Sequence, residues 1–318
     1  MKHARWLLIA LCLIAVVGIV WLLTCVPAEQ KACQAPEKPV SKTVVLYTSL
    51  SEPLIEEITI GFEKSNPGFI LKVCHLSAGL AHTKIASDRM ETENSGDVVW
   101  LSDPSPFRTF IREGLLAPMD EQTVKEPFGL DGKYVRIAAA SEVVFASTEE
   151  TMLPGSWTDL LQASRILIAD PSSSGTTLSI LHALAANPAF GLDYIRNLSK
   201  SDVTVLSGIG PVAYAVGKDK GSIGILTKDM MCKTSGDVSY KGLEDFRIIM
   251  PFPIAIFSDA SEKEGAEALI AYILSDEGQK IVESEGLLRG AEADVMDTGE
   301  LMGRREMIRY FNELFLAQ

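Results

Sequence analysis

A run of small hydroxyl residues at the start of one predicted helix has the composition of an anion-binding site. Residues 172–177 follow an apolar stretch, residues 166–169, that is predicted to be a buried strand, and they precede an apolar helix. The first turn of a helix leaves about four backbone N–H groups unpaired and carries a partial positive charge. Gly175 allows a ligand to approach this backbone closely, and the hydroxyl groups add donors. The same residues also form a good helix N-cap, so this segment alone leaves both interpretations open.

The same pattern of strand, small or hydroxyl residues and helix recurs along the chain. Besides residues 172–177, it occurs at residues 48–49, 77–79, 102–103 and 207–210. Strands that alternate with helices through short loops predict parallel βαβ units and therefore an α/β fold. Ligands of such folds bind outside the carboxyl ends of the strands, so these loops are expected to face one cleft.

The composition limits the classes of partner. The chain has 318 residues, with 29 Lys and Arg against 42 Asp and Glu, and a formal net charge of −13. This charge disfavours nucleic acid and anionic membrane surfaces as partners. It does not exclude a small anion, because local N–H groups and hydroxyl groups would bind it. The length, with 47% hydrophobic residues, suffices for two domains with their own cores.

Residues 1–24 are predicted to be a signal peptide or a membrane anchor. A basic start precedes an uncharged apolar stretch that, as a helix, would span about 28 Å, close to the thickness of a bilayer core. Two interpretations stay open: an uncleaved anchor, or a signal peptide that ends in a segment similar to a lipoprotein box, with Cys25 lipidated. Thr24 departs from the small residue usual before that cysteine. Residues 25–42 have the composition of a tether, so the body is expected outside the cytoplasm, attached to the membrane.

Neither the cysteines nor the histidines have the spacing of a catalytic or metal site. No pair of the five cysteines has metal-ligand spacing. His75, His82 and His182 have no Ser or Cys partner in a recognisable nucleophile motif. The sequence therefore predicts no metal, no cofactor and no enzymatic activity.

Several short segments occur in the order typical of a known family. They include Asp-Pro-Ser-Ser-Ser-Gly-Thr at residues 170–176, and the full set is residues 44–49, 62–68, 96–100, 114–118, 157–161, 168–176, 215–225 and 268–279. Together they resemble the type II periplasmic solute-binding proteins of ABC transporters, in the branch that includes binders of ferric ion and of phosphorylated small molecules. The resemblance implies two α/β domains, each with a mixed, mostly parallel sheet flanked by helices, and a ligand cleft between them that closes about a hinge. It places residues 43–143 and 251–318 in domain 1 and residues 144–250 in domain 2.

Two departures from the family pattern bear on the ligand. Ferric-ion binders of this branch place adjacent tyrosines after the strand matched here by Gly224 and Ile225, whereas this chain has Leu-Thr-Lys-Asp at residues 226–229. The absence of these phenolates favours an anion over iron, and a ferric-ion-binding protein stays as an alternative. In addition, the strands predicted at residues 246–250 and 254–257 join directly at Phe252 and Pro253, where relatives usually carry a longer loop. Loss of that loop would widen the cleft, change its ligand, or leave a protein that no longer binds in the usual way.

The resemblance implies an extracytoplasmic protein that delivers a small anion, an organophosphate or a phosphonate, to an ABC permease. A membrane-anchored sensor for the same ligand class is the alternative. We expect a monomer. We expect Asp103 to accept from ligand hydroxyl or amino groups and Lys228 to pair with the anion, although an N-cap and a solvated lysine explain these residues equally well. The expected ligand-binding residues are Thr48, Ser49, Ser77, Asp103, Ser173, Ser174, Gly175, Thr176, Thr177, Gly208 and Lys228.

Overall fold

The structure is a computed structural model. It describes residues 41–76, 81–91, 96–119, 130–150, 153–290 and 302–317. Cys25, Ser77, the whole of the predicted anchor and residues 25–40 of the tether lie outside these residues. No helix within the described ranges is long and apolar enough to cross a membrane.

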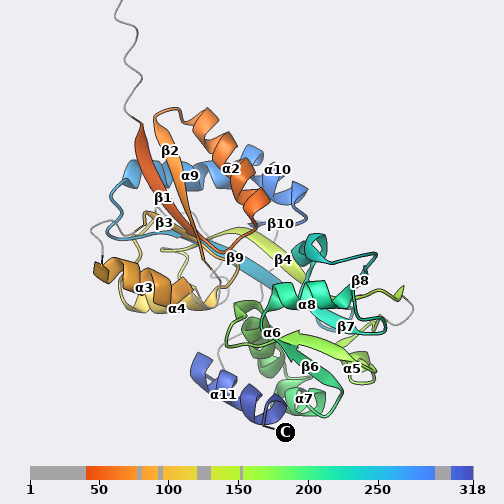
Figure 1. The fold of residues 1–318 in the computed structure, drawn as a ribbon. Helices are drawn as coiled ribbons and strands as arrows, with labels where there is room; N and C mark the ends of the chain where they lie inside the picture. Colours follow the sequence, from red (N-terminus) through yellow and green to blue (C-terminus); the bar gives the residue numbers. More distant parts are fainter. Residues whose placement is uncertain are drawn as a thin grey trace, which may run out of the picture. The chain divides into compact units, whose positions relative to one another are not determined.

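Strands and helices alternate along the described chain, as the sequence predicts (Figure 1). The strands are β1 (Lys42–Thr48), β2 (Phe69–His75), β3 (Val98–Trp100), β4 (Arg136–Ser147), β5 (Ile166–Ala169), β6 (Val203–Leu206), β7 (Ile223–Thr227), β8 (Ser239–Gly242), β9 (Ile249–Ile256) and β10 (Leu288–Arg289). The helices are α2 (Glu52–Ser65), α3 (Ala81–Glu91), α4 (Ser105–Arg112), α5 (Trp157–Leu160), α6 (Gly175–Ala186), α7 (Gly191–Leu198), α8 (Ile209–Val216), the 3₁₀ helix η4 (Lys228–Lys233), α9 (Lys263–Leu274), α10 (Asp276–Ser284) and α11 (Arg304–Phe315).

The strands form a sheet in the order β2-β1-β3-β9-β4-β7-β5-β6, with β8 and β10 also paired to β4. The outer pairs are parallel: β1 with β2 and β3, and β5 with β6 and β7. The pairs that involve β4 and β9 are antiparallel. Each end of the sheet is therefore a parallel α/β unit, and antiparallel strands join the two.

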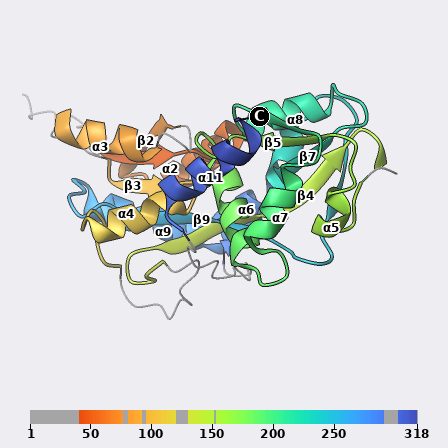
Figure 2. The ribbon, with the colours of Figure 1, turned by 90° about the horizontal axis from the view of Figure 1, so that it is seen from below.

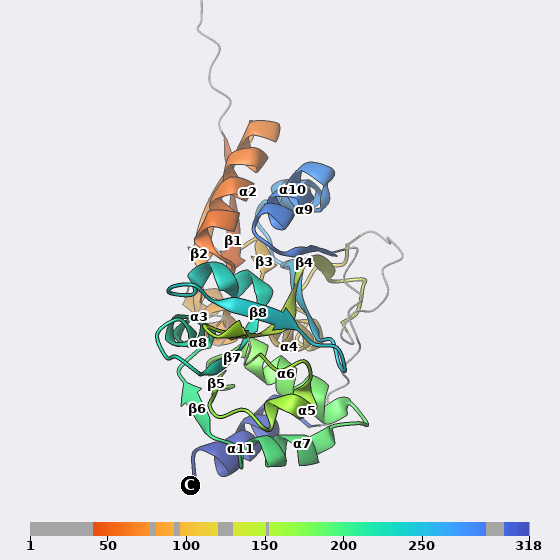
Figure 3. The same cartoon turned by 90° about the vertical axis from the view of Figure 1, so that its right-hand side faces the viewer.

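Strand β4 divides the sheet into two halves (Figure 3). Its residues 136–142 pair with β9, and its residues 143–147 pair with β7 and β8. We call β1, β2, β3, β9 and residues 136–142 the first half, and β5, β6, β7, β8 and residues 143–147 the second half. The chain crosses once along β4 and returns before β9, where Val143 donates its N–H to the Ile248 carbonyl at 2.9 Å.

The prediction of two strands joined at Phe252 and Pro253 is wrong, because β9 runs without interruption from Ile249 to Ile256. Proline has no N–H to donate to a neighbouring strand, which is why the sequence indicated a break. Here β4 shifts its register between Ile137 and Ala139, opposite Pro253 and Phe252. This irregularity accommodates the proline in the interior of the sheet, so the predicted shortened loop does not exist.

Helix α6 is buried on almost every side, which explains its apolar sequence. It contacts α7 and α11 (Figure 2), and the Tyr310 hydroxyl of α11 donates to the Leu192 carbonyl of α7 at 3.3 Å. The predicted division assigned α11 to domain 1, whereas α11 packs on helices of the second half. The boundaries near residues 143 and 250 stay a prediction.

Trp157 anchors the core of the second half. Its side chain is fully buried and packs edge-on against Phe145, with ring centroids 5.1 Å apart. Its indole N–H donates to the Phe246 carbonyl at 2.9 Å, and its own carbonyl accepts from the Tyr194 hydroxyl at 2.6 Å. This packing holds the segment that leads into β5, whose carboxyl end carries the residues 172–177.

Candidate functional site

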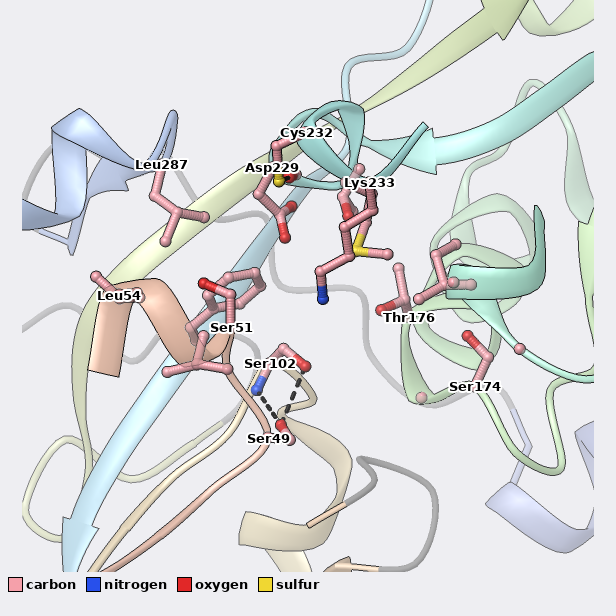
Figure 4. A pocket seen from close by; sticks show the side chains of 18 of the residues that line it. Ser49, Ser51, Leu54, Ser102, Ser174, Thr176, Asp229, Cys232, Lys233 and Leu287 are labelled. Carbon is pink, nitrogen blue, oxygen red and sulfur yellow. Dashed lines mark hydrogen bonds between the residues drawn. The ribbon is translucent and has the colours of Figure 1, made fainter. Parts of the chain in front are cut away.

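A cavity of about 320 Å³ lies between the two halves, within the range of small-molecule sites. Its walls come from the loops after β1, β3, β5 and β6, from η4 and from the segment after α10. Figure 4 shows these side chains converging. The lining residues are Ser49, Leu50, Ser51, Leu54, Leu76, Ser102, Ser173, Ser174, Gly175, Thr176, Ser207, Gly208, Ile209, Gly210, Thr227, Asp229, Met230, Cys232, Lys233, Phe252, Glu285 and Leu287.

The first turn of α6 both caps the helix and opens on the cavity. The Ser174 side chain accepts from the Thr177 N–H at 3.2 Å, so the N-cap interpretation is correct for this serine. Within the described residues, no hydrogen bond is found from the N–H groups of Gly175 and Thr176. Because one side-chain cap satisfies only one of the orphan donors, the turn keeps N–H groups for a ligand.

A second helix start lies beside the first. Gly208 precedes α8 and has no side chain to cap it. In the described part of the chain, the N–H groups of Ile209 and Gly210 also lack an acceptor. The Ser173 hydroxyl donates to the Ser207 carbonyl at 2.6 Å and so fastens the β5–α6 loop to the β6–α8 loop. Two partially positive helix ends therefore line one cavity.

The first half contributes hydroxyl groups from two loops. The Ser102 N–H donates to the Ser49 hydroxyl at 3.0 Å, and the two hydroxyl oxygens lie 3.1 Å apart (Figure 4). This pair links the loop after β1 to the loop after β3. The two serines thereby present a fixed polar surface opposite the helix starts of the second half.

Charged side chains enter the cavity from η4 and from the segment after α10. Lys233 points its ammonium group into the cavity, and the Asp229 carboxylate faces it from the same helix (Figure 4). Among the described residues, Lys233 has no ion-pair partner. Burial raises the pKa of the Cys232 thiol; the negative charges of Asp229 and Glu285 act in the same direction and Lys233 opposes them. These three charges therefore lie close to one another around Cys232.

Six of the predicted ligand-binding residues line the cavity: Ser49, Ser173, Ser174, Gly175, Thr176 and Gly208. Three others, Thr48, Thr177 and Lys228, do not line it. The Thr48 hydroxyl is buried and accepts from the Leu50 N–H at 3.2 Å. The Thr177 hydroxyl donates to Ser174 at 3.1 Å, and the Lys228 ammonium lies 5.9 Å from the centre of the exposed Tyr240 ring. Ser77 falls outside the described residues.

Asp103 lies behind the cavity wall rather than in it. Its carboxylate is buried and accepts from the N–H and the hydroxyl of Ser105, at 2.9 and 2.8 Å. Its side chain fills the space beside Gly175 that a Cβ would need. Arg304 of α11 lies 4.0 Å away. Burial raises the pKa of Asp103, and the Ser105 hydrogen bonds and the Arg304 charge oppose that rise. Asp103 thus joins the two halves of the molecule.

Sequence reasoning did not single out Lys233 or Asp229 for the site. The 3₁₀ helix η4 carries residues 228–233; Lys233 lines the cavity, whereas Lys228 does not and lies against the Tyr240 ring. A helix start directly after the buried strand β7 is the signal that would have directed attention to this segment. No tyrosine lines the cavity, and the described residues hold no cluster of three potential metal-ligating side chains.

The fold, with crossing strands and a cavity between two α/β halves, is that of the type II periplasmic binding proteins. Residues 43–288 match the family described as bacterial extracellular solute-binding protein, and the chain belongs to this family. The resemblance predicted from the sequence is therefore confirmed. The protein is therefore an extracytoplasmic solute-binding protein.

Solved structures with this fold bind different ligands. Iron-bound HitA from Pseudomonas aeruginosa is 16% identical with a TM-score of 0.69, and the match covers 86% of this chain and 99% of that one. AfuA from Actinobacillus pleuropneumoniae, with fructose-6-phosphate bound, is 18% identical with a TM-score of 0.70, covering 87% and 100%. The sulfate-binding protein SubI from Mycobacterium tuberculosis is 15% identical with a TM-score of 0.62, covering 86% and 91%. A search of the curated proteins finds no significant match.

Proposed function

We propose that the cavity binds a small oxyanion with an organic substituent, an organophosphate or a phosphonate. The observation that carries this proposal is the Lys233 ammonium beside two helix starts whose first N–H groups lack acceptors in the described part of the chain. Helix N-termini bind phosphate-like groups because N–H donors and a positive dipole end act together. The lysine adds a full charge to this arrangement.

The shape of the cavity favours an ester over a free inorganic ion. Leu50, Leu54, Phe252 and Leu287 form an apolar part of the lining. Leu54 and Leu287 lie across the cavity from Ser174 and Thr176 of the first turn of α6 (Figure 4). An apolar wall stabilises carbon atoms of a ligand by removing them from water. The fructose-6-phosphate in AfuA is a ligand of this class held by the same fold.

Ferric ion is the less supported alternative. A hard cation needs anionic oxygen ligands, and no tyrosine lines the described cavity. Asp229, Cys232 and Glu285 do line it, but the described residues hold no group of three such side chains placed to bind a metal ion. Iron-bound HitA shares the fold, but at 16% identity this likeness does not extend to the ligand.

Calorimetric titration with inorganic phosphate, sulfate, ethyl phosphate, glucose-6-phosphate and ferric citrate tests the proposal. We expect the phosphate esters to bind, and Lys233→Met to weaken them by about tenfold or more, since a charged hydrogen bond contributes about 1.5–3 kcal/mol. Lys228→Met is the matched control and should change the affinity by less than about twofold. Binding of ferric citrate alone, or equal effects of the two lysine variants, would contradict the proposal.

We also propose that the N-terminus tethers the protein, with Cys25 as the lipidated residue. Metabolic labelling with palmitate should mark the wild-type protein and not Cys25→Ala. Membrane retention of a wild-type protein that takes up no label would instead indicate an uncleaved anchor at residues 1–24. That result would favour the membrane sensor over delivery to a permease.

A further inference from the structure

The charges that line the cavity do not suit a purely anionic ligand. Lys233 is its one lysine or arginine, while Asp229 and Glu285 supply two carboxylates, all within the described lining. Two helix starts and Lys233 are sufficient for one oxyanion. An anion alone would leave both carboxylates without a counter-charge and close to the negative ligand, which is unfavourable in a partly enclosed site.

The Asp229 carboxylate lacks a hydrogen-bond donor for one of its oxygens in the described structure. One of its carboxylate oxygens, Oδ1, is buried and has no hydrogen-bond partner in the described structure. A buried acceptor without a donor costs free energy, so such groups in native proteins usually receive a ligand or water. Figure 4 shows the carboxylate directed into the cavity.

The backbone around Asp229 is held in place from two sides. Its N–H donates to the Ser141 hydroxyl of the crossing strand β4 at 3.3 Å, and its carbonyl accepts from the Cys232 thiol at 3.1 Å. Lys233 follows on the same short helix, yet no ion pair joins the two side chains in the described structure. The helix therefore presents one positive and one negative group to the cavity, separately.

We propose that the ligand is a zwitterion: its oxyanion binds at the starts of α6 and α8 and at Lys233, and its primary ammonium donates to Asp229. Glu285 adds negative potential near the ammonium. This assignment rests on the proposed function and makes Asp229 the residue that selects among oxyanions. It excludes ligands whose second end is another anion, because Asp229 and Glu285 would repel that end.

The test compares two ligands that differ only in the ammonium group, ethyl phosphate and phosphoethanolamine, by calorimetric titration of the full chain. We expect phosphoethanolamine to bind the wild-type protein at least about tenfold more tightly, the contribution of one charged hydrogen bond. Asp229→Asn keeps the shape and removes the charge, so it should bring the two affinities to within about twofold. The matched control is Asp237→Asn, because Asp237 is exposed and outside the cavity lining. It should keep the full preference.

The outcomes separate this inference from the proposed function. Equal binding of both ligands by the wild-type protein, with loss in Lys233→Met, overturns the zwitterion and leaves the oxyanion site standing. A preference that survives Asp229→Asn also overturns the role of Asp229. Failure of both ligands to bind, with no effect of Lys233→Met on any phosphate ester, overturns the oxyanion site itself. If Asp229→Asn does not fold, equal affinities of the wild-type protein for the two ligands still overturn the zwitterion.

Discussion

Gly175 lies where the two halves of the molecule touch, and a single methyl group there is the most informative perturbation. A Cβ added to Gly175 would overlap the Asp103 carboxyl group and would lie 2.6 Å from the Asp103 Cβ. Carbon atoms in ordinary contact are about 3.5–4.0 Å apart. Gly175→Ala therefore requires a shift of about 1 Å between α6 and the loop after β3.

The expected magnitude follows from two opposing effects. Alanine in place of glycine favours a helix by up to about 1 kcal/mol, less in the first turn. Overpacking a well-packed contact costs about 1–3 kcal/mol. We expect a net loss of about 1–2 kcal/mol in the free energy of unfolding. The strain can instead be relieved by a separation of the two halves, which would pull the walls of the cavity apart. The same free energy then lowers the affinity for phosphoethanolamine by about tenfold.

A double-mutant cycle measures the contact directly by urea unfolding and by titration with phosphoethanolamine. The cycle needs Asp103→Gly, since Asp103→Ala would keep the Cβ that clashes. The double variant should recover most of the loss, with a coupling energy of about 0.5–3 kcal/mol. Gly303→Ala is the matched control, because an added Cβ there meets no atom within 4 Å. Wild-type stability and affinity in Gly175→Ala, or no coupling to residue 103, would refute the reasoning.

Two further predictions concern buried polar groups. Trp157→Phe removes the donor to the Phe246 carbonyl and leaves space in the core. Urea unfolding should therefore show a decrease of about 2 kcal/mol or more in the free energy of unfolding. An unchanged urea midpoint would contradict this expectation. Burial raises the pKa of Asp103 above its ordinary 3.8, so the folded protein holds this proton more tightly than the unfolded chain. Wild-type stability relative to Asp103→Asn should therefore be highest below about pH 4 and fall as the pH rises through the raised pKa. A constant difference in unfolding free energy across that range would count against it.

The secondary structure could be predicted where local signals are strong. The alternation of apolar strands with helices that start at serine or threonine predicted the α/β fold, because both hydrophobic periodicity and capping are properties of neighbouring residues. The prediction failed at β9, where two prolines indicated a break. The irregularity of β4 that accommodates Pro253 lies more than 100 residues away in sequence, and no local pattern reports it.

The candidate site, like the secondary structure, could be predicted from the sequence only in part. The donors at the start of α6 follow from Ser174, Gly175 and Thr176 themselves, since a helix start offers N–H groups wherever it lies. The sequence by itself therefore determined that such donors exist and that they follow a buried strand. Lys228 and Lys233 are equivalent as residue types, so composition could not say which one reaches the cavity.

Only the tertiary structure decided which charges face one another. The turn of η4 brings Lys233 and Asp229 to the cavity and leaves Lys228 outside, and the contact of the halves puts Asp103 against Gly175. Each of these outcomes depends on the approach of segments that are far apart along the chain. Such an approach is set by the packing of whole halves about β4 and β9, whereas propensity and capping act only between neighbours.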